Sequence, residues 1–169
     1  MNNNEFNADS ASLSVDLSEA RQAVKENRFQ DALDLFKIIL ESDPQHIDSL
    51  YLMSVSYRYL KDFDESQKSI ERLLFIAPDM GRAYQELGHI HRDRGDLAKA
   101  SIHYRQACEL NPALLASWNS LYKYFVESKN KPAADRCYEE IEKLQSLPPS
   151  LLYIDQIMNE GRLGIAETQ

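Results

Sequence analysis

Residues 83–112 of the chain read AYQELGHIHRDRGDLAKASIHYRQACELNP and predict two amphipathic helices joined by a short turn. Apolar and small residues recur every three or four positions on both sides of Gly95, the spacing that places side chains on one helical face. Gly95 suits the turn because glycine adopts a positive φ at little cost. Pro112 ends the second helix because proline has no backbone N–H to donate. The stretch therefore predicts a helix–turn–helix unit.

Small residues decide how the two helices of this unit pack. Gly88 on the first helix and Ala100 on the second predict the closest approach, because neither carries a bulky group. The space around the crossing is filled by Tyr84, Leu87 and Tyr104. A single pair of helices cannot cover its own apolar face, so the sequence predicts neighbouring copies of the unit.

Copies of the unit recur at one fixed interval along the chain, which we call the repeat period. The matched positions in successive copies are Pro44, Pro78 and Pro112; Ala32, Ser66 and Ala100; Phe29, Phe63 and Leu97; and Phe36, Ile70 and Tyr104. This pattern resembles the tetratricopeptide repeat (TPR), a helix–turn–helix of about 34 residues. The resemblance implies an all-α fold, a right-handed α-solenoid in which stacked antiparallel helix pairs form a superhelix.

The repeat period predicts how the chain is divided. Residues 1–11 are polar and are expected to form a disordered tail, and residues 12–169 are expected to form the TPR domain. Four full repeats are expected at about 13–46, 47–80, 81–114 and 115–146. In the fourth repeat, Tyr122 replaces a small residue, so its two helices are expected to pack more openly. Lys129 and Lys131 replace the turn glycine and the apolar residue that follows it.

The last residues, 147–169, suggest a partial fifth repeat. The run GRLGIA, with Gly161, Leu163 and Ala166, reproduces the spacing of GDLAKA around Gly95. We interpret the chain as a fragment of a longer protein. Alternatively, Ser150–Asn159 forms a C-terminal capping helix. An uncovered apolar face at Leu151, Ile154 and Ile157 would allow self-association through this partial repeat.

Composition limits the classes of partner. The net charge of −8 argues against a nucleic-acid partner, because phosphate binding requires a basic surface. No apolar run approaches the roughly 20 residues that cross a membrane, and the N-terminus lacks a secretory signal, so a cytoplasmic location is expected. Cys108 and Cys137 lie in different repeats and are expected to be reduced, buried thiols.

The TPR resemblance also implies a binding surface. In this family the first helix of each repeat lines a concave groove. The groove positions carried over to this chain are Tyr51, Val55, Arg58, Tyr59, Arg82, Gln85, His89, Arg92, Asn119 and Lys123, accompanied by Asp48, Asp93, Ala116, Val126 and Glu127. Cations and tyrosines gather there on an acidic chain, which suggests an acidic or carboxylate-bearing peptide as the ligand. The alternative is that these are solvated charges on an exposed helix face.

One specific TPR function is not supported by the sequence. Some TPR domains bind the carboxy-terminal peptide of heat-shock chaperones through lysine and asparagine at fixed inner positions. The corresponding positions hold Tyr51, Val55 and Glu86 in one frame and Leu17, Arg21 and Leu52 in the other. That chaperone clamp is therefore not expected.

No arrangement typical of catalysis or metal binding is found in the sequence. His89 and His91 are two positions apart on a helix and point in different directions, so they are not expected to share a metal. The chain lacks the CxxC, HExxH and GxSxG motifs and a phosphate-binding glycine loop. We therefore interpret it as a non-enzymatic scaffold for a protein or peptide, without a cofactor.

A narrower resemblance suggests an alternative. Residues 87–167, with ELNPALLASW, LPPSLL and NEGRLGIAE, are similar to the repeat arrays that precede the catalytic domain of bacterial TPR-containing sulfotransferases. This resemblance implies an N-terminal regulatory or substrate-presenting arm of a larger enzyme. None of the phosphate-binding residues of that catalytic domain occurs in the chain, so no catalytic position is carried over.

Overall fold

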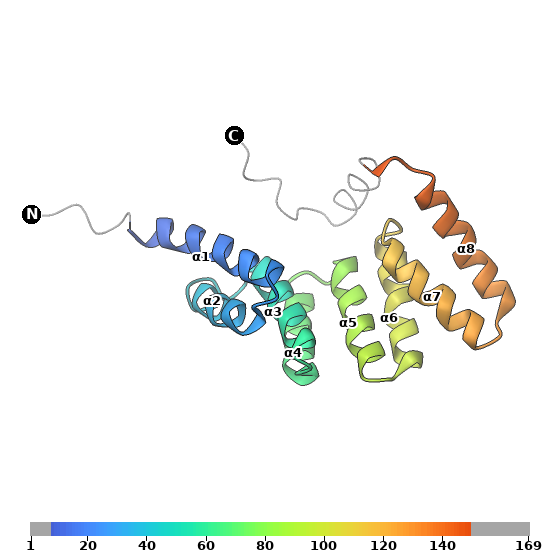
Figure 1. Ribbon diagram of the computed structural model, residues 1–169, viewed down its shortest axis with the longest axis horizontal. Helices are drawn as coiled ribbons and strands as arrows, with labels where there is room; N and C mark the ends of the chain where they lie inside the picture. Colours follow the sequence, from blue (N-terminus) through green and yellow to red (C-terminus); the bar gives the residue numbers. More distant parts are fainter. Residues whose placement is uncertain (1–7, 150–169) are drawn as a thin grey trace, which may run out of the picture. The chain divides into compact units, whose positions relative to one another are not determined.

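The computed structural model describes residues 8–149, with side chains from residue 17 onward, and this range contains eight α-helices and no strand (Figure 1). The helices are α1 (Ala8–Lys25), α2 (Phe29–Ser42), α3 (Ile47–Tyr59), α4 (Phe63–Ile76), α5 (Gly81–Asp93), α6 (Leu97–Leu110), α7 (Leu115–Glu127) and α8 (Lys131–Gln145). They form four helix pairs, and each lies inside one of the predicted repeats except at the start of α1. The all-α fold of stacked helix pairs is therefore confirmed.

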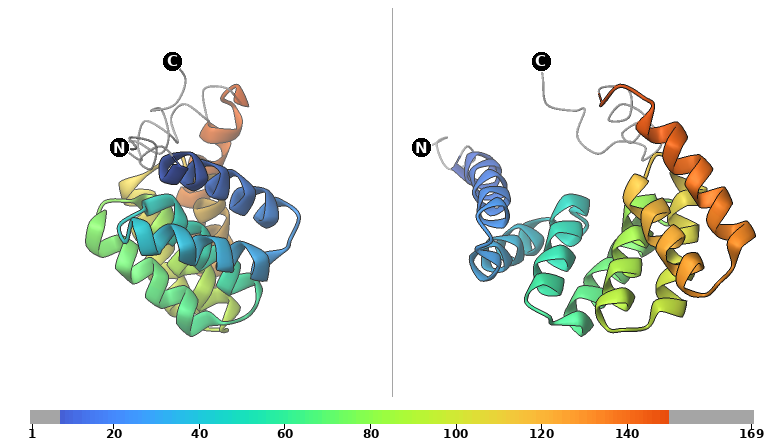
Figure 2. Two further views of the ribbon diagram at one scale, coloured as in Figure 1. Left: turned by 90° about the vertical axis from the view of Figure 1, so that its left-hand side faces the viewer. Right: turned by 45° about the vertical axis from the view of Figure 1, so that its right-hand side comes forward.

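The four pairs are divided between two compact units. The first unit contains α1–α4 and the second contains α5–α8. Within each unit, every helix packs against the helix that follows it in the chain (Figure 2). Each pair thus covers the apolar face of its neighbour in the same unit, as the repeat period predicts.

Helix α1 begins earlier than predicted. It starts at Ala8, inside the stretch 1–11 that the sequence analysis assigned to a disordered tail. Residues 8–11 read ADSA, in which alanine is the best helix former and an acidic residue in the first turn favours the helix dipole. Because the sequence prediction relied on apolar periodicity, which these residues lack, it missed this first turn.

The turn inside each helix pair has the same backbone conformation in all four repeats. Asn27, Lys61, Gly95 and Lys129 are each one repeat period apart and have φ angles of 59°, 63°, 87° and 58°. The residue after the turn precedes the second helix. In the third and fourth repeats this residue, Asp96 or Asn130, caps the helix, because its side chain accepts a hydrogen bond from a backbone N–H. Lys129 keeps the turn even though it replaces the predicted glycine.

Close contacts between the helices of a pair lie at predicted small residues in the second and third repeats. In the second repeat, Ser54 and Ser66 occupy the positions of Gly88 and Ala100, and their hydroxyl oxygens lie 3.1 Å apart. In the third repeat, the ring of Tyr104 covers Gly88, where an added Cβ would lie 2.5 Å from Cε1 of that ring. Tyr104 is only 2% exposed as a result.

The fourth repeat fills its helix crossing with different residues, and the more open packing expected of it stays a prediction. Tyr122 replaces Gly88 and Tyr138 replaces Tyr104 in this pair, and the centroids of their two rings are 6.0 Å apart. Tyr138 is 47% exposed, whereas the equivalent Tyr104 is buried.

Both cysteines are buried free thiols, as predicted. Cys108 on α6 and Cys137 on α8 belong to an apolar cluster with Ala100, Tyr104 and Leu121. Burial raises the pKa of both thiols, so they stay protonated near neutral pH.

Two further predictions concern membrane-spanning helices and the C-terminal end of the chain. No helix among residues 8–149 is both long and apolar enough to cross a membrane. The predicted capping helix and partial fifth repeat, with Leu151, Ile154 and Ile157, lie outside the described residues.

Candidate functional site

The predicted groove residues all lie on the first helices of repeats two, three and four. Tyr51, Val55, Arg58 and Tyr59 are on α3, in the first unit. The other six, Arg82, Gln85, His89, Arg92, Asn119 and Lys123, are on α5 and α7, in the second unit. The ten residues therefore form two sets, one in each unit. A continuous groove along repeats two to four stays a prediction.

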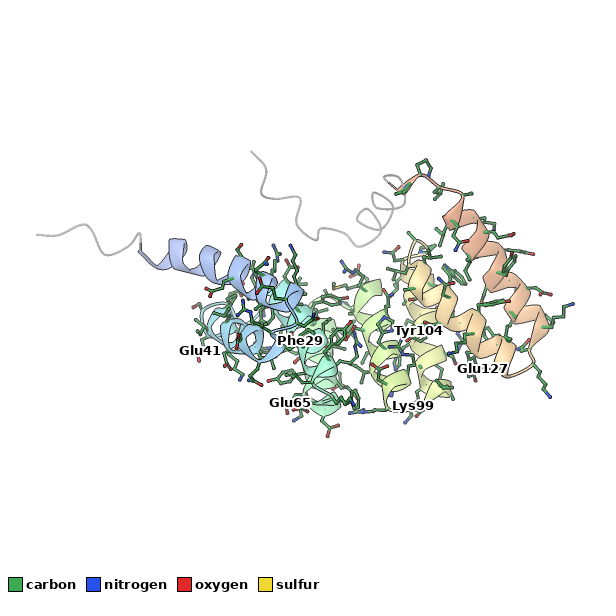
Figure 3. The ribbon with its side chains drawn as sticks, in the orientation of Figure 1. Phe29, Glu41, Glu65, Lys99, Tyr104 and Glu127 are labelled. Carbon is green, nitrogen blue, oxygen red and sulfur yellow. The ribbon has the colours of Figure 1, made fainter. Side chains whose placement is uncertain are left out.

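In the first unit, the end of α3 is covered by aromatic contacts. Tyr59 stacks on Phe29 of α2, with ring centroids 4.7 Å apart and planes within 2° of parallel. Figure 3 labels Phe29 among the side chains of this unit. The guanidinium of Arg58 lies 4.7 Å from the centroid of the Tyr59 ring. Nearer the start of α3, Asp48 forms an ion pair with Arg21 of α1. The predicted groove residues of this unit thus contact one another and α1 and α2.

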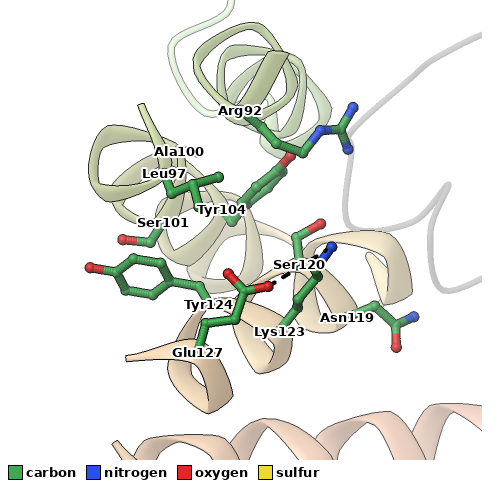
Figure 4. A pocket seen from close by; sticks show the side chains of 10 residues that line it. All are labelled: Arg92, Leu97, Ala100, Ser101, Tyr104, Asn119, Ser120, Lys123, Tyr124 and Glu127. Atoms are coloured by element: carbon green, nitrogen blue, oxygen red, sulfur yellow. Dashed lines mark ion pairs between the residues drawn. The ribbon is translucent and has the colours of Figure 1, made fainter. Parts of the chain in front are cut away.

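In the second unit, residues of α5, α6 and α7 line a pocket of about 490 Å³ that is open to solvent on one side. Its lining combines cations, small residues and two tyrosines: Arg92, Leu97, Ala100, Ser101, Tyr104, Asn119, Ser120, Lys123, Tyr124 and Glu127 (Figure 4). The pocket brings together Arg92 from the third repeat with Asn119 and Lys123 from the fourth. Among the ten predicted groove residues, these three line it, together with the accompanying groove position Glu127.

The two cations of the pocket already have acidic neighbours. Arg92 donates from Nε to Oδ1 of Asp93 at 2.9 Å, and its Nη2 lies 2.8 Å from the same oxygen. Lys123 Nζ lies 4.0 Å from Oε1 of Glu127. Both pairs are substantially exposed, and exposed pairs of this kind contribute about 1 kcal/mol or less. A ligand carboxylate can therefore compete with either acidic side chain.

His89 links the pocket to the core of the third repeat. Its Nδ1 lies 2.7 Å from the hydroxyl oxygen of Tyr104 and 3.2 Å from Nη1 of Arg92. Because Arg92 only donates, its contact with His89 is a hydrogen bond when Nδ1 carries no proton. The Arg92 side chain is thus held in place by His89 and Asp93.

Sequence reasoning missed the contribution of the second helix. Leu97, Ala100, Ser101 and Tyr104 of α6 line the pocket, whereas the groove was predicted from first helices alone. A signal was present in the sequence, because Ser101 occupies the position of Leu33 two repeats earlier. The other two repeats have Gln67 and Asp135 at this position, and the smaller serine indicates space at that point of the third repeat.

The remaining histidines of this helix pair do not join the pocket. His91, two positions after His89, instead stacks on His103 of α6, with ring centroids 5.1 Å apart. Burial lowers the pKa of both imidazoles, and the nearby charge of Arg94 lowers that of His91 further. Within residues 8–149, no group of three or more His, Cys, Asp or Glu side chains is arranged to hold a metal ion.

Comparison with known families supports this description. Residues 47–80 and 81–114 each match the family model of the tetratricopeptide repeat. Residues 47–114 are two tetratricopeptide repeats. The matches begin and end at the boundaries predicted for the second and third repeats. A DnaJ protein of Arabidopsis thaliana, the P58IPK homolog, is 28% identical over 95 residues, which cover 54% of this chain and 20% of that protein.

Solved structures share the TPR fold. MamA from Desulfovibrio magneticus RS-1 aligns with a TM-score of 0.68 and 19% identity over 79% of this chain and 75% of that one. The first TPR domain of Spaghetti (RPAP3), solved with the HSP90 peptide SRMEEVD, aligns with a TM-score of 0.64 and 19% identity over 74% of this chain and 99% of that one. The chain spans a fifth or less of the length of the curated relatives that it matches.

Proposed function

We propose that the chain is a non-catalytic scaffold that binds an acidic or carboxylate-bearing peptide in the pocket between α5, α6 and α7. The observation that carries this proposal is the pair of cations, Arg92 and Lys123, at one pocket on a chain of net charge −8. Asn119 lines the same pocket, and its side-chain amide can donate to and accept from the backbone of a peptide.

Arg92 keeps donors for a ligand in spite of its neighbours. A guanidinium has five N–H groups. Asp93 engages Nε and Nη2, and His89 engages Nη1. One N–H therefore remains on each terminal nitrogen, and both can donate to the carboxylate of a ligand. Because His89 and Asp93 hold the side chain, less entropy is lost when a ligand binds.

Lys123 responds differently to a ligand. Its side chain is 78% exposed and its contact with Glu127 is long, so the ammonium can turn toward an incoming carboxylate at little cost. A carboxylate bound by both Arg92 and Lys123 would then replace Glu127 as the partner of the ammonium.

A structural neighbour offers a ligand of the same chemistry. The peptide SRMEEVD that accompanies the Spaghetti domain contains three acidic residues. The lysine and asparagine positions of the chaperone clamp are not matched in this chain, so the likeness supports an acidic peptide as the class of ligand and not the chaperone peptide itself.

Selection from a random-peptide phage library on the full chain tests the proposal. We expect the enriched peptides to be acidic, and we expect Arg92→Ala to weaken their binding by about tenfold, or about 1.4 kcal/mol. Lys123→Ala should weaken binding less, because this side chain is more exposed and more weakly held. Arg82→Ala should also weaken it less, because Arg82 does not line the pocket.

The selection has a matched control. Arg105 is an exposed arginine of α6 that does not line this pocket, so Arg105→Ala removes one positive charge without changing the site. Its affinity for the selected peptides should stay close to that of the unchanged chain. Enrichment of neutral or basic peptides, or equal affinity of the Arg92 and Arg105 variants, would refute the proposal.

The resemblance to sulfotransferase arrays supplies a second candidate function. The chain would then act as the substrate-presenting or regulatory arm of a larger enzyme, with the same pocket receiving the acidic segment. The full reading frame of the gene distinguishes the two candidates. A phosphate-binding catalytic sequence after residue 169 would support the enzyme arm, and any other continuation or a stop codon would remove it.

A further inference from the structure

The two units differ at equivalent positions around the pocket. The positions two repeats before Glu127 and Leu97 lie at the end of α3 and at the start of α2, in the first unit. There, Tyr59 occupies the position of Glu127, and Phe29 occupies the position of Leu97. In the first unit the tyrosine stacks on the phenylalanine, with ring centroids 4.7 Å apart, and is itself 56% exposed. In the second unit the glutamate leaves the leucine 44% exposed, and the pocket is open beside it.

Other substitutions change the lining in both directions, and Tyr124 replaces the smaller Ser56. Ser101 replaces Leu33 and Ser120 replaces Leu52, so two leucine side chains of the first unit have no equivalent in the second. Leu33 is almost completely buried in its own unit. The hydroxyls of Ser101 and Ser120 donate to carbonyl oxygens of their own helices, and so compete little for a ligand in the pocket.

We propose that the pocket of the second unit binds an aromatic side chain of the acidic peptide, in the place that Tyr59 fills within the first unit. This inference rests on the proposed function and names the residue that anchors the ligand. An aromatic ring would cover Leu97 and Ala100 of α6, and the cations at the edge would meet the acidic neighbours of that residue. An aromatic side chain removes a large apolar area from water when it is buried, so the pocket favours peptides that carry one.

The volume of the pocket agrees with this occupant. At about 490 Å³ it lies at the lower end of the range for small-molecule sites, so it admits one aromatic side chain with part of its backbone and not an entire folded element. Tyr104 and Tyr124 form two of its walls. Aromatic rings favour edge-to-face and offset contacts with such neighbours, which adds selectivity beyond the buried area.

The sharpest test places the aromatic pair of the first unit at the equivalent two positions of the second unit. The double variant Leu97→Phe/Glu127→Tyr reproduces the stacked pair and should close the pocket. Glu127→Gln removes the same charge without adding a ring, so it is the matched control. Both changed positions are about half-exposed, and circular dichroism checks that each variant folds.

The two variants have opposite expected effects on a selected acidic peptide that contains one phenylalanine. Loss of the Glu127 charge favours an acidic ligand, so Glu127→Gln should raise its affinity. The double variant should lose at least tenfold affinity, because its own tyrosine occupies the pocket. Replacing the phenylalanine of the peptide by alanine should lower its affinity for the unchanged chain by at least tenfold. The same replacement should not lower its affinity for the double variant any further.

The outcomes separate this inference from the proposed function. Enrichment of acidic peptides without an aromatic residue, or a double variant that binds as well as Glu127→Gln, would overturn the aromatic anchor and leave acidic-peptide binding intact. Failure of the Arg92→Ala variant to weaken binding would overturn the proposed function instead. An aromatic peptide that loses affinity on the double variant alone supports the inference.

Discussion

Two serines at equivalent positions differ in their hydrogen bonds. Ser49 and Ser117 are two repeats apart, and both are completely buried. The hydroxyl of Ser49 lies 2.9 Å from Nδ1 of His46, whereas the hydroxyl of Ser117 has no hydrogen-bond partner. A buried hydroxyl without a partner costs free energy, because it has lost its hydrogen bonds to water.

We expect opposite effects on stability from removing the two hydroxyls. Ser49→Ala should lower the free energy of unfolding by about 1 kcal/mol, because it removes a satisfied hydrogen bond. Ser117→Ala should leave it unchanged or raise it by up to about 1 kcal/mol, since it removes an unsatisfied group and improves helix propensity. Urea denaturation of both variants measures this difference. Equal losses for the two would show that the Ser117 hydroxyl is satisfied in solution.

Single residues show where sequence reasoning succeeds and where it stops. Gly95 predicted the left-handed turn of the third repeat. Lys129 was interpreted as a departure from the pattern, yet its φ of 58° shows that the turn is retained. The stacking of Tyr59 on Phe29 was not predicted, because it depends on a contact between residues that are distant in sequence and belong to different repeats.

At the scale of helix pairs, the crossing of α5 and α6 depends on the fit between Gly88 and Tyr104. Gly88→Ala should lower the free energy of unfolding by about 1–3 kcal/mol, because the added Cβ would lie 2.5 Å from the buried ring. In the second repeat the partner at this position is Ile70, and a serine is accepted there. The same Gly88→Ala change should therefore cost much less in a Tyr104→Ile background. A double-mutant cycle measures the coupling, and additive effects would contradict this packing.

The stacked histidines give the same helix pair a dependence on pH. Burial lowers the pKa of His91 and His103 below the ordinary value of 6.5 that applies to the unfolded chain. Below about pH 6.5 the unfolded state therefore binds more protons than the folded state, so stability falls as the solution is acidified. Arg94 and Lys99 disfavour the protonated imidazole of His91, and Asp96 favours it.

Replacement of both histidines tests this origin of acid sensitivity. We expect the urea midpoint of the unchanged chain to fall between about pH 7 and pH 5.5, as the imidazoles begin to be protonated. The His91→Gln/His103→Gln variant should show a smaller fall over the same range. An identical pH dependence in the two proteins would assign the effect to other groups.

Helix pairs were the most predictable feature of the chain, because their apolar period and turn residues are local. The start of α1 was less predictable, since residues 8–11 form helix without an apolar stripe. The stack of His91 on His103 was also missed. Sequence spacing indicated that His91 points away from His89, but it could not identify the side chain on the opposite helix.

At the scale of the whole molecule, equivalent positions in the two units carry different side chains. The first unit stacks its own tyrosine on Phe29, and the second leaves a pocket with cations at its edge. The repeat period predicts the backbone of both, because it reflects packing positions that all repeats share. The difference depends on residues such as Glu127, Ser101 and Ser120, which can differ between repeats because the fold does not require them.

Titration of the isotope-labelled full chain with a selected acidic, phenylalanine-containing peptide, followed by backbone amide NMR, tests the pocket most directly. We expect the largest shift changes at residues of the pocket, Arg92, Ser101, Asn119 and Lys123, with little change at Tyr51 and Val55 of α3. Shift changes centred on α3, or distributed over both units without a maximum between α5, α6 and α7, would contradict the assignment of this pocket as the binding site.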